Sequence, residues 1–134
     1  MSEKSEPLAS QTCVSCAGST PPATAEEISR LLAHLSGWLL VQVGEVPQLQ
    51  KQYRFKNFRQ ALAFTNEVGA VAEAAGHHPA LLTEWGKVTV SWWTHVVGGL
   101  HRNDFVMAAK TDEIAERSTA ERFAVERSAV EKSS

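Results

Sequence analysis

The sequence predicts an α+β domain in which a four-stranded, mostly antiparallel sheet is covered on one face by three helices. The predicted order is helix, strand, strand, helix, strand, strand, helix. Two observations support this fold class. Apolar and polar residues alternate in 49–55 and 87–95, as they do in half-buried strands. Three other segments carry apolar residues at helical spacing, and each helix needs a surface on which to bury them.

The first predicted helix begins after Thr24 and ends at Gly37. The motif "TAEE" is typical of a capping box, with Thr24 at the N-cap and Glu27 three residues later. Apolar residues then follow at helical spacing, namely Ile28, Leu31, Leu32 and Leu35. The next two segments, 38–43 and 49–55, are predicted strands, and "GEVPQ" between them indicates a hairpin.

A long second helix is predicted to follow Asn57, which can cap it. Gly76 suits a left-handed C-terminal cap, and Pro79 cannot continue the helix. We expect one side of this helix to face the core through Phe58, Ala61, Leu62, Thr65, Val68, Ala72 and Ala75. The adjacent His77 and His78 therefore lie where a helix stops, on backbone that is constrained at both ends.

Two further strands are predicted at 80–84 and 87–95. Alternation in the second strand places Val88, Val90, Trp92 and Thr94 on one face, and Thr89, Ser91, Trp93 and His95 on the other. The last helix is expected to start near His101 and to run to about Arg117. Its predicted inner residues are Phe105, Ala108, Ala109 and Ile114.

The two ends of the chain differ from the predicted domain at 24–117. Residues 1–23 are rich in Ser, Thr and Pro, which predicts a disordered leader. Within it, "CVSC" is interpreted as two reduced thiols, Cys13 and Cys16. Half of a shared metal site and a redox pair are the alternatives. Residues 118–134 repeat every five residues and form no continuous helical stripe, which predicts a mobile or frayed helical tail; a weak partner-binding helix is the alternative.

Composition restricts the class of protein. The chain has 134 residues, 43% of them hydrophobic, which is enough for one modest core. A net charge of -2 and a pI near 6.2 give no electrostatic reason to expect nucleic-acid binding. No apolar run approaches the roughly 20 residues of a membrane helix, and the N-terminus lacks the apolar core of a secretory signal. We therefore expect a cytoplasmic protein with no membrane partner.

Three histidines, His77, His78 and His95, precede an aspartate, Asp104, and three interpretations compete for them. The histidines could cap a helix by bonding its last carbonyls. They could bind zinc, although adjacent histidines rarely reach one ion and the sequence has no HExxH or paired CxxC. They could perform acid–base catalysis, because histidine gives and takes protons near neutral pH. We favour catalysis, since several histidines around one pocket suit a reaction that removes a proton and a hydroxyl group.

The acidic and aromatic neighbours are less specific. Glu73 lies four residues before His77 and could hold its imidazole or stay on the surface as a solvated carboxylate. Asp104 could be functional or could simply stabilise the first turn of a helix. Trp92 and Trp93 are of a type found mostly in cores and interfaces, and stacking on a flat ligand is the rarer use.

Taken together, "EAAGHHP", Trp85, "KVTVSWWTH", "GGL" and Asp104 resemble the pterin-4a-carbinolamine dehydratase family. The resemblance covers about 25–117 and is most specific from Glu73 to Asp104. The stretch "LLTEWGKVTV" is similar to bacterial-type members found beside phenylalanine hydroxylase.

The resemblance implies a hydro-lyase that dehydrates 4a-hydroxytetrahydropterin to quinonoid dihydropterin and so recycles the cofactor of aromatic amino acid hydroxylases. It implies no metal and no organic cofactor. The implied catalytic residues are His77, His78 and His95, and the implied substrate-binding residues are Glu73, Pro79, Trp85, Thr94 and Asp104. We expect His78 to be the principal acid–base group, with His77 and His95 positioning the pterin.

Some positions depart from the family pattern. Leu81 stands where many members have Trp, Thr83 and Glu84 replace a common Asn-Val, and Asn103 stands where animal members often have Arg. These changes predict a differently shaped pocket rim. The resemblance also implies a homodimer or homotetramer and a hydroxylase as a possible partner. The alternative function is a protein-interaction module that acts as a dimerisation cofactor or regulator of a partner protein.

Overall fold

The computed structural model describes residues 7–11 and 22–133, with side chains as far as Arg117. It confirms the predicted α+β class and element order. Four antiparallel strands form one sheet in the order β1-β2-β4-β3. The strands are β1 (Leu39–Val43), β2 (Val46–Arg54), β3 (Ala80–Glu84) and β4 (Lys87–Trp92). The helices are α1 (Ala25–Leu32), α2 (Phe58–Ala75) and α3 (Arg102–Ser133), with short 3-10 helices η2 (Leu8–Ser10) and η3 (His95–Val97).

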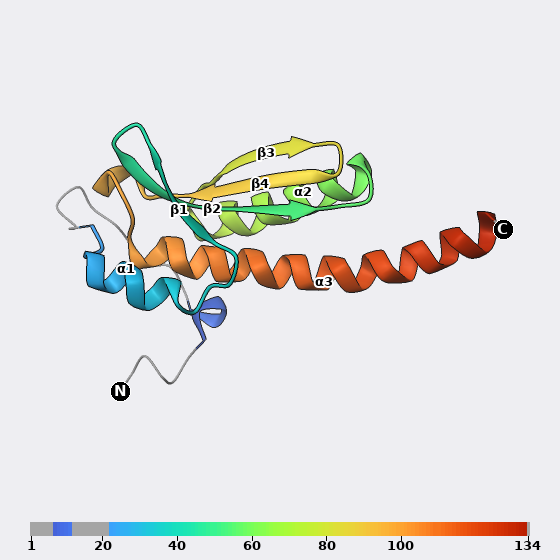
Figure 1. Cartoon of the computed structure of the whole chain (residues 1–134), viewed down its shortest axis with the longest axis horizontal. Helices are drawn as coiled ribbons and strands as arrows, with labels where there is room; N and C mark the ends of the chain where they lie inside the picture. The colour runs from blue at the N-terminus through green and yellow to red at the C-terminus, as the bar shows by residue number, and fades with distance from the viewer. Residues whose placement is uncertain (1–6, 12–21, 134) are drawn as a thin grey trace.

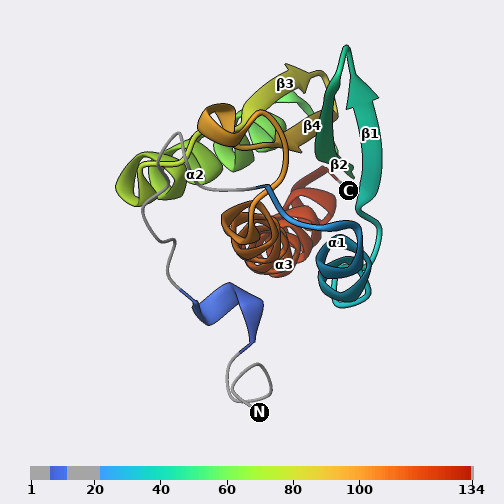
Figure 2. The same ribbon diagram turned by 90° about the vertical axis from the view of Figure 1, so that its left-hand side faces the viewer.

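The helices lie on one side of the sheet, as Figures 1 and 2 show. Helices α2 and α3 pack against the sheet, and α1 lies beside α3 near β1. The core lies between these layers, where the strands contribute Leu49, Tyr53, Val88, Val90 and Trp92. Because side chains alternate along a strand, the same register turns Gln50, Gln52 and Thr89 to the opposite sheet face.

Local sequence accounts for the start of α1 and for both ends of α2, whereas α1 ends at Leu32, before the predicted end at Gly37. The predicted capping box is present, because the Thr24 side chain accepts a hydrogen bond from the Glu27 backbone N–H and the Glu27 side chain accepts one from the Thr24 backbone N–H. Asn57 caps α2 by accepting from the Gln60 backbone, and Gly76 ends that helix at a φ of 68°. A left-handed residue stops the helical ladder, so the chain leaves α2 directly before His77.

The inner side of α2 differs partly from the prediction. Ala61, Phe64, Val68 and Ala72 are buried, whereas Phe58 and Leu62 are 45% and 42% exposed. The buried residues follow each other at intervals of three and four, which sets the stripe that faces the sheet. Leu62 lies about 100° around the helix from Ala61 and therefore points away from that stripe.

A polar cluster joins α3 to β2 and to the start of the sheet. Asp112 accepts hydrogen bonds from Trp38 Nε1, Lys51 Nζ and Tyr53 Oη. Burial raises the pKa of the Tyr53 phenol strongly, and the hydrogen bond to Asp112 and the nearby negative charges of Asp112 and Glu116 raise it further. The cluster fixes the position of α3 against the sheet.

The ends of the last two elements differ from the predicted ones. Strand β4 ends at Trp92, three residues before the predicted end, because the chain turns into η3 at His95. Helix α3 continues to Ser133 and projects beyond the sheet, whereas the prediction ended it near Arg117 (Figure 1).

Part of the predicted leader packs on the domain. In η2, the Ala9 carbonyl accepts from Lys110 Nζ, and the neighbouring Gln11 side chain accepts from Arg102. Cys13 and Cys16 lie outside the described residues.

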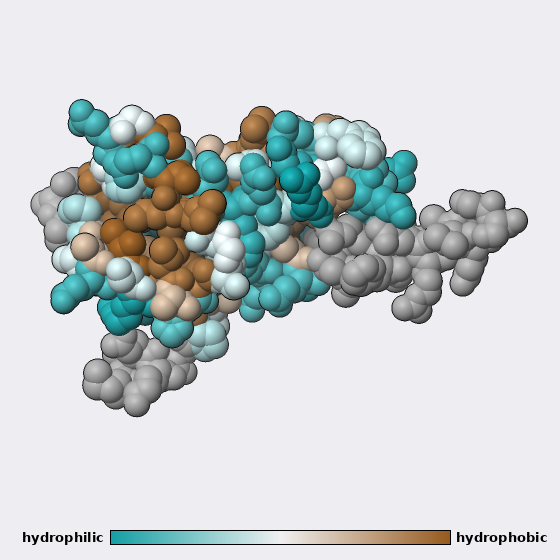
Figure 3. All heavy atoms as spheres, in the orientation of Figure 1, coloured by the Kyte–Doolittle hydropathy of each residue, from teal (hydrophilic) through white to brown (hydrophobic). Residues whose placement is uncertain are grey.

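Several apolar side chains are exposed on β1, including Leu39 at 64% and Val43 at 50%. Figure 3 shows hydrophobic residues gathered over this part of the molecule. Strand β1 is an edge strand, so it also presents unpaired backbone groups. Among the helices in the described ranges, none is both long and apolar enough to cross a membrane.

Candidate active site

Asp104 lies at the centre of the candidate site, in the first turn of α3, and its side chain is completely buried. Its Oδ2 atom accepts a hydrogen bond from Thr94 Oγ1 at 2.8 Å and from the His101 backbone N–H at 2.9 Å. Its Oδ1 atom lies 2.6 Å from His77 Nε2. Asp104 thus stabilises the start of α3 and also holds two side chains from other elements.

His77 is fixed from two directions. Because an ionised carboxylate only accepts hydrogen bonds, we assign the proton to His77 Nε2, which leaves Nδ1 as the acceptor of the neutral ring. The ring also stacks on Trp92, with centroids 5.7 Å apart and planes 3° from parallel. The side chain is 12% exposed, so most of its surface touches protein.

Of the two alternatives for Glu73, a partner of His77 or a carboxylate on the surface, the structure shows no bond to His77 and an exposed side chain. The structure pairs Glu73 Oε1 with His78 Nε2 at 2.8 Å, and Asp104 takes the place by His77. The reason is the left-handed backbone at Gly76, which turns His77 off the helix that carries Glu73. The His78 and Glu73 side chains are 61% and 81% exposed, so this second pair is open to solvent.

His95 lies beside this pair of histidines in the fold. The pairing of Ala80 with Ser91 places the residues before β3 next to those after β4. Thr94 is buried and bridges to Gly99, and His95, the first residue of η3, is exposed. The His95 ring packs 4.8 Å from the Trp93 ring, centroid to centroid. His77 therefore bonds Asp104 directly. His78 follows His77 in the chain, and His95 follows Thr94, which also bonds Asp104.

Of the eight predicted site residues, Asp104 bonds His77 and Thr94, and Glu73 bonds His78. Pro79 and His95 are the chain neighbours of His78 and Thr94. Pro79 is partly buried and links His78 to β3. Trp85 is the exception, because it lies in the turn between β3 and β4 and is 73% exposed. The six residues of β4, at about 3.3 Å each, separate that turn from the Thr94 end by roughly 20 Å. Within one chain, Trp85 does not contribute to this site.

Sequence reasoning missed the support behind His77. Trp92 was expected on the buried face, but its contact with the His77 ring was not foreseen, and Thr111 was not singled out. The available signal was the place of Trp92 at the end of an alternating strand, two residues before Thr94.

The donor set does not resemble a metal centre. Across residues 7–11 and 22–117, no group of three or more His, Cys, Asp or Glu side chains is arranged to hold a metal ion. The two pairs present are each one imidazole with one carboxylate. Such pairs orient a histidine ring, which suits proton transfer.

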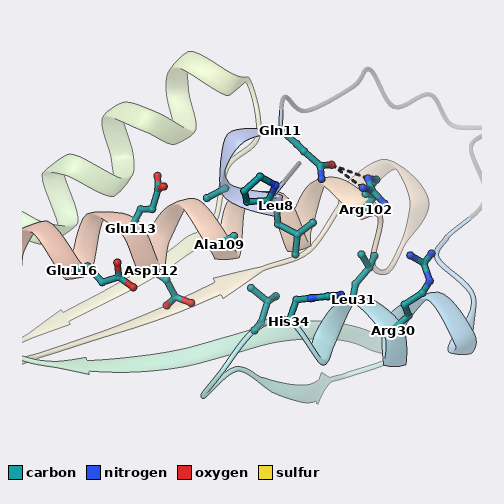
Figure 4. Close-up of a pocket in the computed structure, with 13 residues that line it drawn as sticks. Leu8, Gln11, Arg30, Leu31, His34, Arg102, Ala109, Asp112, Glu113 and Glu116 are labelled. Atoms are coloured by element: carbon teal, nitrogen blue, oxygen red, sulfur yellow. Dashed lines mark hydrogen bonds between the residues drawn. The ribbon is translucent and has the colours of Figure 1, made fainter. Parts of the chain in front are cut away.

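A separate pocket of about 910 Å³ lies between η2, α1 and α3 (Figure 4). Arg30 and Arg102 lie toward one end, and Glu113 and Glu116 lie toward the other. None of the predicted site residues lines it. It opens on a different face of α3 from Asp104, so we do not assign the catalytic chemistry to it.

The family model described as pterin 4 alpha carbinolamine dehydratase matches residues 21–114, which is more than half of the chain. The chain belongs to the pterin 4 alpha carbinolamine dehydratase family. A relative from Microcystis aeruginosa is 58% identical over 113 residues, covering 84% of this chain and 97% of the relative. Another relative, from Gloeobacter violaceus, is 56% identical over 108 residues, covering 81% and 93%. Both relatives carry provisional names as pterin-4-alpha-carbinolamine dehydratases.

A solved structure of the family has the same fold. It is described as a transcriptional coactivator/pterin dehydratase from Brucella melitensis. Its TM-score is 0.65 at 31% sequence identity, and the match covers 70% of this chain and 98% of that chain.

Proposed function

We propose that this protein dehydrates 4a-hydroxytetrahydropterin to quinonoid dihydropterin. The observation that carries the proposal is the buried Asp104 carboxylate, which binds His77 and Thr94, the chain neighbours of His78 and His95. Membership of the pterin 4 alpha carbinolamine dehydratase family supports the same reaction.

The reaction is an elimination across the C4a–N5 bond of the pterin. The C4a–O bond breaks, and the hydroxyl group takes up a proton and leaves as water. The proton on N5 is lost, and its bonding electrons form the C4a=N5 double bond. A general acid must therefore act at the hydroxyl group and a general base at N5.

We assign the main proton transfer to His78. Its side chain is 61% exposed, so a substrate can approach it and it can exchange protons with water. Glu73 orients the ring by pairing with Nε2. A histidine so placed can give one proton and take another within a single turnover.

His77 and His95 are proposed to position the pterin and to share the proton traffic. His77 is held rigidly by Asp104 and Trp92, and its Nδ1 atom remains as a hydrogen-bond acceptor. His95 is exposed beside Trp93, whose ring supplies an apolar surface. Thr94 and Pro79 complete the substrate-binding group together with Glu73 and Asp104.

The wider role follows from the substrate. A 4a-hydroxytetrahydropterin is the form in which an aromatic amino acid hydroxylase releases its cofactor, so we propose that this protein recycles the cofactor of such an enzyme in the cytoplasm. We also propose self-association, because the sheet ends in two edge strands, β1 and β3, and β1 exposes Leu39 and Val43.

A second candidate function is that of an interaction module. The Brucella relative is described as a transcriptional coactivator as well as a pterin dehydratase. In this chain, Phe58 and Leu62 lie one turn apart on α2 and are both exposed, which offers a small apolar surface to a partner.

A stopped-flow assay tests the dehydratase proposal. A hydroxylase generates 4a-hydroxytetrahydropterin, and its decay is followed with the wild-type protein, His78→Ala and His34→Ala. His34 is an exposed histidine outside the site, which makes it a matched control. We expect wild type and His34→Ala to accelerate the decay and His78→Ala to lose most of the effect. No acceleration by folded wild-type protein would overturn the proposal and favour the interaction module.

A further inference from the structure

A line of buried contacts lies behind His77. The imidazole ring stacks on Trp92, whose indole Nε1–H donates to Thr111 Oγ1 at 3.1 Å. The Thr111 hydroxyl in turn donates to the Met107 carbonyl at 2.7 Å. Trp92 is 0% exposed and Thr111 is 1% exposed, so water does not compete for these bonds. The line runs from the candidate site to the second turn of α3 and beyond.

The two contacts of His77 restrain different motions. The bond from Nε2 to Asp104 fixes one atom of the ring but allows the ring to rotate about that bond. The stack on Trp92, with planes 3° from parallel, restricts that rotation. Together the contacts fix both the place and the plane of the imidazole. A binding group held in this way loses little freedom when the substrate arrives.

Trp92 can restrain His77 only if its own indole ring is held. Thr111 meets this need, since its oxygen accepts the indole N–H while its proton is committed to Met107. A valine would fill nearly the same volume and would offer no acceptor. The hydroxyl at position 111 therefore has a specific use on the buried side of α3, where Ala108 and Ile114 are apolar.

We propose that Trp92 and Thr111 are positioning residues for His77. They set the plane of the imidazole so that Nδ1 meets the pterin in one orientation. The proposal rests on the proposed function for its kinetic consequence, but the restraint on the His77 ring is a property of the free protein. The two parts can therefore be tested separately.

The experiment compares Thr111→Val, Thr111→Ser and Trp92→Leu with wild type. A matched control is Thr65→Val, because the Thr65 hydroxyl also forms a partly buried hydrogen bond, to Thr83 Oγ1 at 2.6 Å. Thr65 lies about 16 Å along α2 from Gly76 and therefore far from the candidate site. Steady-state assays give KM and kcat for the hydroxypterin. Nitrogen-15 NMR of the imidazoles reports the His77 tautomer and its ring motion without substrate.

We expect Thr111→Val to raise KM about tenfold with kcat nearly unchanged, and Trp92→Leu to raise it by up to about 100-fold. In both variants the His77 signals should show a mobile ring with mixed tautomers. Thr111→Ser restores the acceptor and should behave as wild type, and Thr65→Val should change neither KM nor the His77 signals. If Trp92→Leu does not fold, the result with Thr111→Val alone decides whether the positioning role is correct.

The outcomes separate the two proposals. Wild-type KM and unchanged His77 signals in folded Thr111→Val would overturn the positioning role while leaving the dehydratase intact. A wild-type protein with no dehydratase activity, but with His77 signals that respond to Thr111→Val, would overturn the proposed reaction and support the restraint. Equal increases in KM in Thr65→Val and Thr111→Val would reduce the effect to general destabilisation and overturn the inference.

Discussion

The His77 Nε2 atom lies 2.6 Å from the Oδ1 atom of Asp104, although the two residues are 27 positions apart in the chain. His77 follows the C-terminal end of α2, and Asp104 belongs to the first turn of α3. One carboxylate therefore completes the start of a helix, through the His101 backbone, and orients a histidine from another element.

Replacement of Asp104 by asparagine should impair both roles. An amide has only one acceptor oxygen, so either the His77 Nε2–H or the pair of donors at Oδ2 loses its acceptor. We expect kcat/KM to fall about 100-fold and the free energy of unfolding to fall by about 1–3 kcal/mol. Enzyme assays and urea unfolding measure these effects.

Asp112→Asn is the matched control for that change. Asp112 accepts three hydrogen bonds, from Trp38, Lys51 and Tyr53, but lies outside the candidate site. The Asp112→Asn variant should have a lower free energy of unfolding than wild type and an unchanged KM. A similar loss of activity in both folded variants would contradict a specific role for Asp104.

Glu73→Gln should have a much smaller effect than Asp104→Asn. Both members of the Glu73–His78 pair are more than half exposed, and exposed ion pairs contribute about 0–1 kcal/mol. The glutamine oxygen can still accept from His78 Nε2. We therefore expect kcat to stay within about fivefold of wild type, measured by stopped flow. A loss of activity as large as that of His78→Ala would show instead that Glu73 itself carries a proton in the reaction.

Replacing Gly69 or Gly76, at α2, by alanine should change the free energy of unfolding in opposite directions. A Cβ atom at Gly69 or Gly76 would meet nothing within 4 Å, so a clash with neighbouring atoms does not contribute to the effect of either substitution. Gly69 lies inside the helix, where alanine should stabilise the protein by about 0.4–1 kcal/mol. Gly76 has a φ of 68°, so alanine there should destabilise it by about 1–2 kcal/mol.

Urea unfolding of the two variants measures both signs. Gly76→Ala should also lower dehydratase activity, because strain at that residue shifts His77 and His78. Equal stabilisation by the two changes would contradict the left-handed cap.

Alkaline pH should destabilise the protein through Tyr53, the only tyrosine in the chain. Its pKa in the folded state is raised by burial and by Asp112, whereas the unfolded chain has a value of about 10. Above that pH the unfolded state loses the phenol proton and the folded state keeps it. The free energy of unfolding should then fall by about 1.4 kcal/mol per pH unit.

Urea unfolding of wild type and Tyr53→Phe on both sides of pH 10 tests this slope. The variant should lack the tyrosine contribution, so the stability advantage of wild type should shrink as the pH rises. Tyrosinate absorbance of the native protein near pH 10 would contradict a raised pKa.

The fold could be predicted because its signals are local. The bounds of α2 follow from Asn57 and Gly76, and β3 occupies the predicted residues 80–84. Burial was harder to predict, since Phe58 and Leu62 have the right character for a core but the sheet covers the Phe64 side of α2 instead. Such a choice depends on how the helix is rotated against the sheet, which no local pattern specifies.

The membership of the candidate site was largely predictable, but its pairing was not. Spacing along a helix linked Glu73 to His77, and only the turn at Gly76 together with the docking of α3 shows that Asp104 takes that place. Trp85 follows the His-His-Pro motif closely in sequence, yet the β3–β4 hairpin carries it to the far end of the sheet.

The bond between His77 and Asp104 exists only when α2 and α3 are docked on the same sheet. A compact, partly denatured state that kept its helices but lost fixed side-chain packing would retain its far-UV circular dichroism and have no assembled site. Activity should therefore disappear before helicity when the protein is gradually destabilised. Turnover would then serve as an early and sensitive indicator of the loss of native packing.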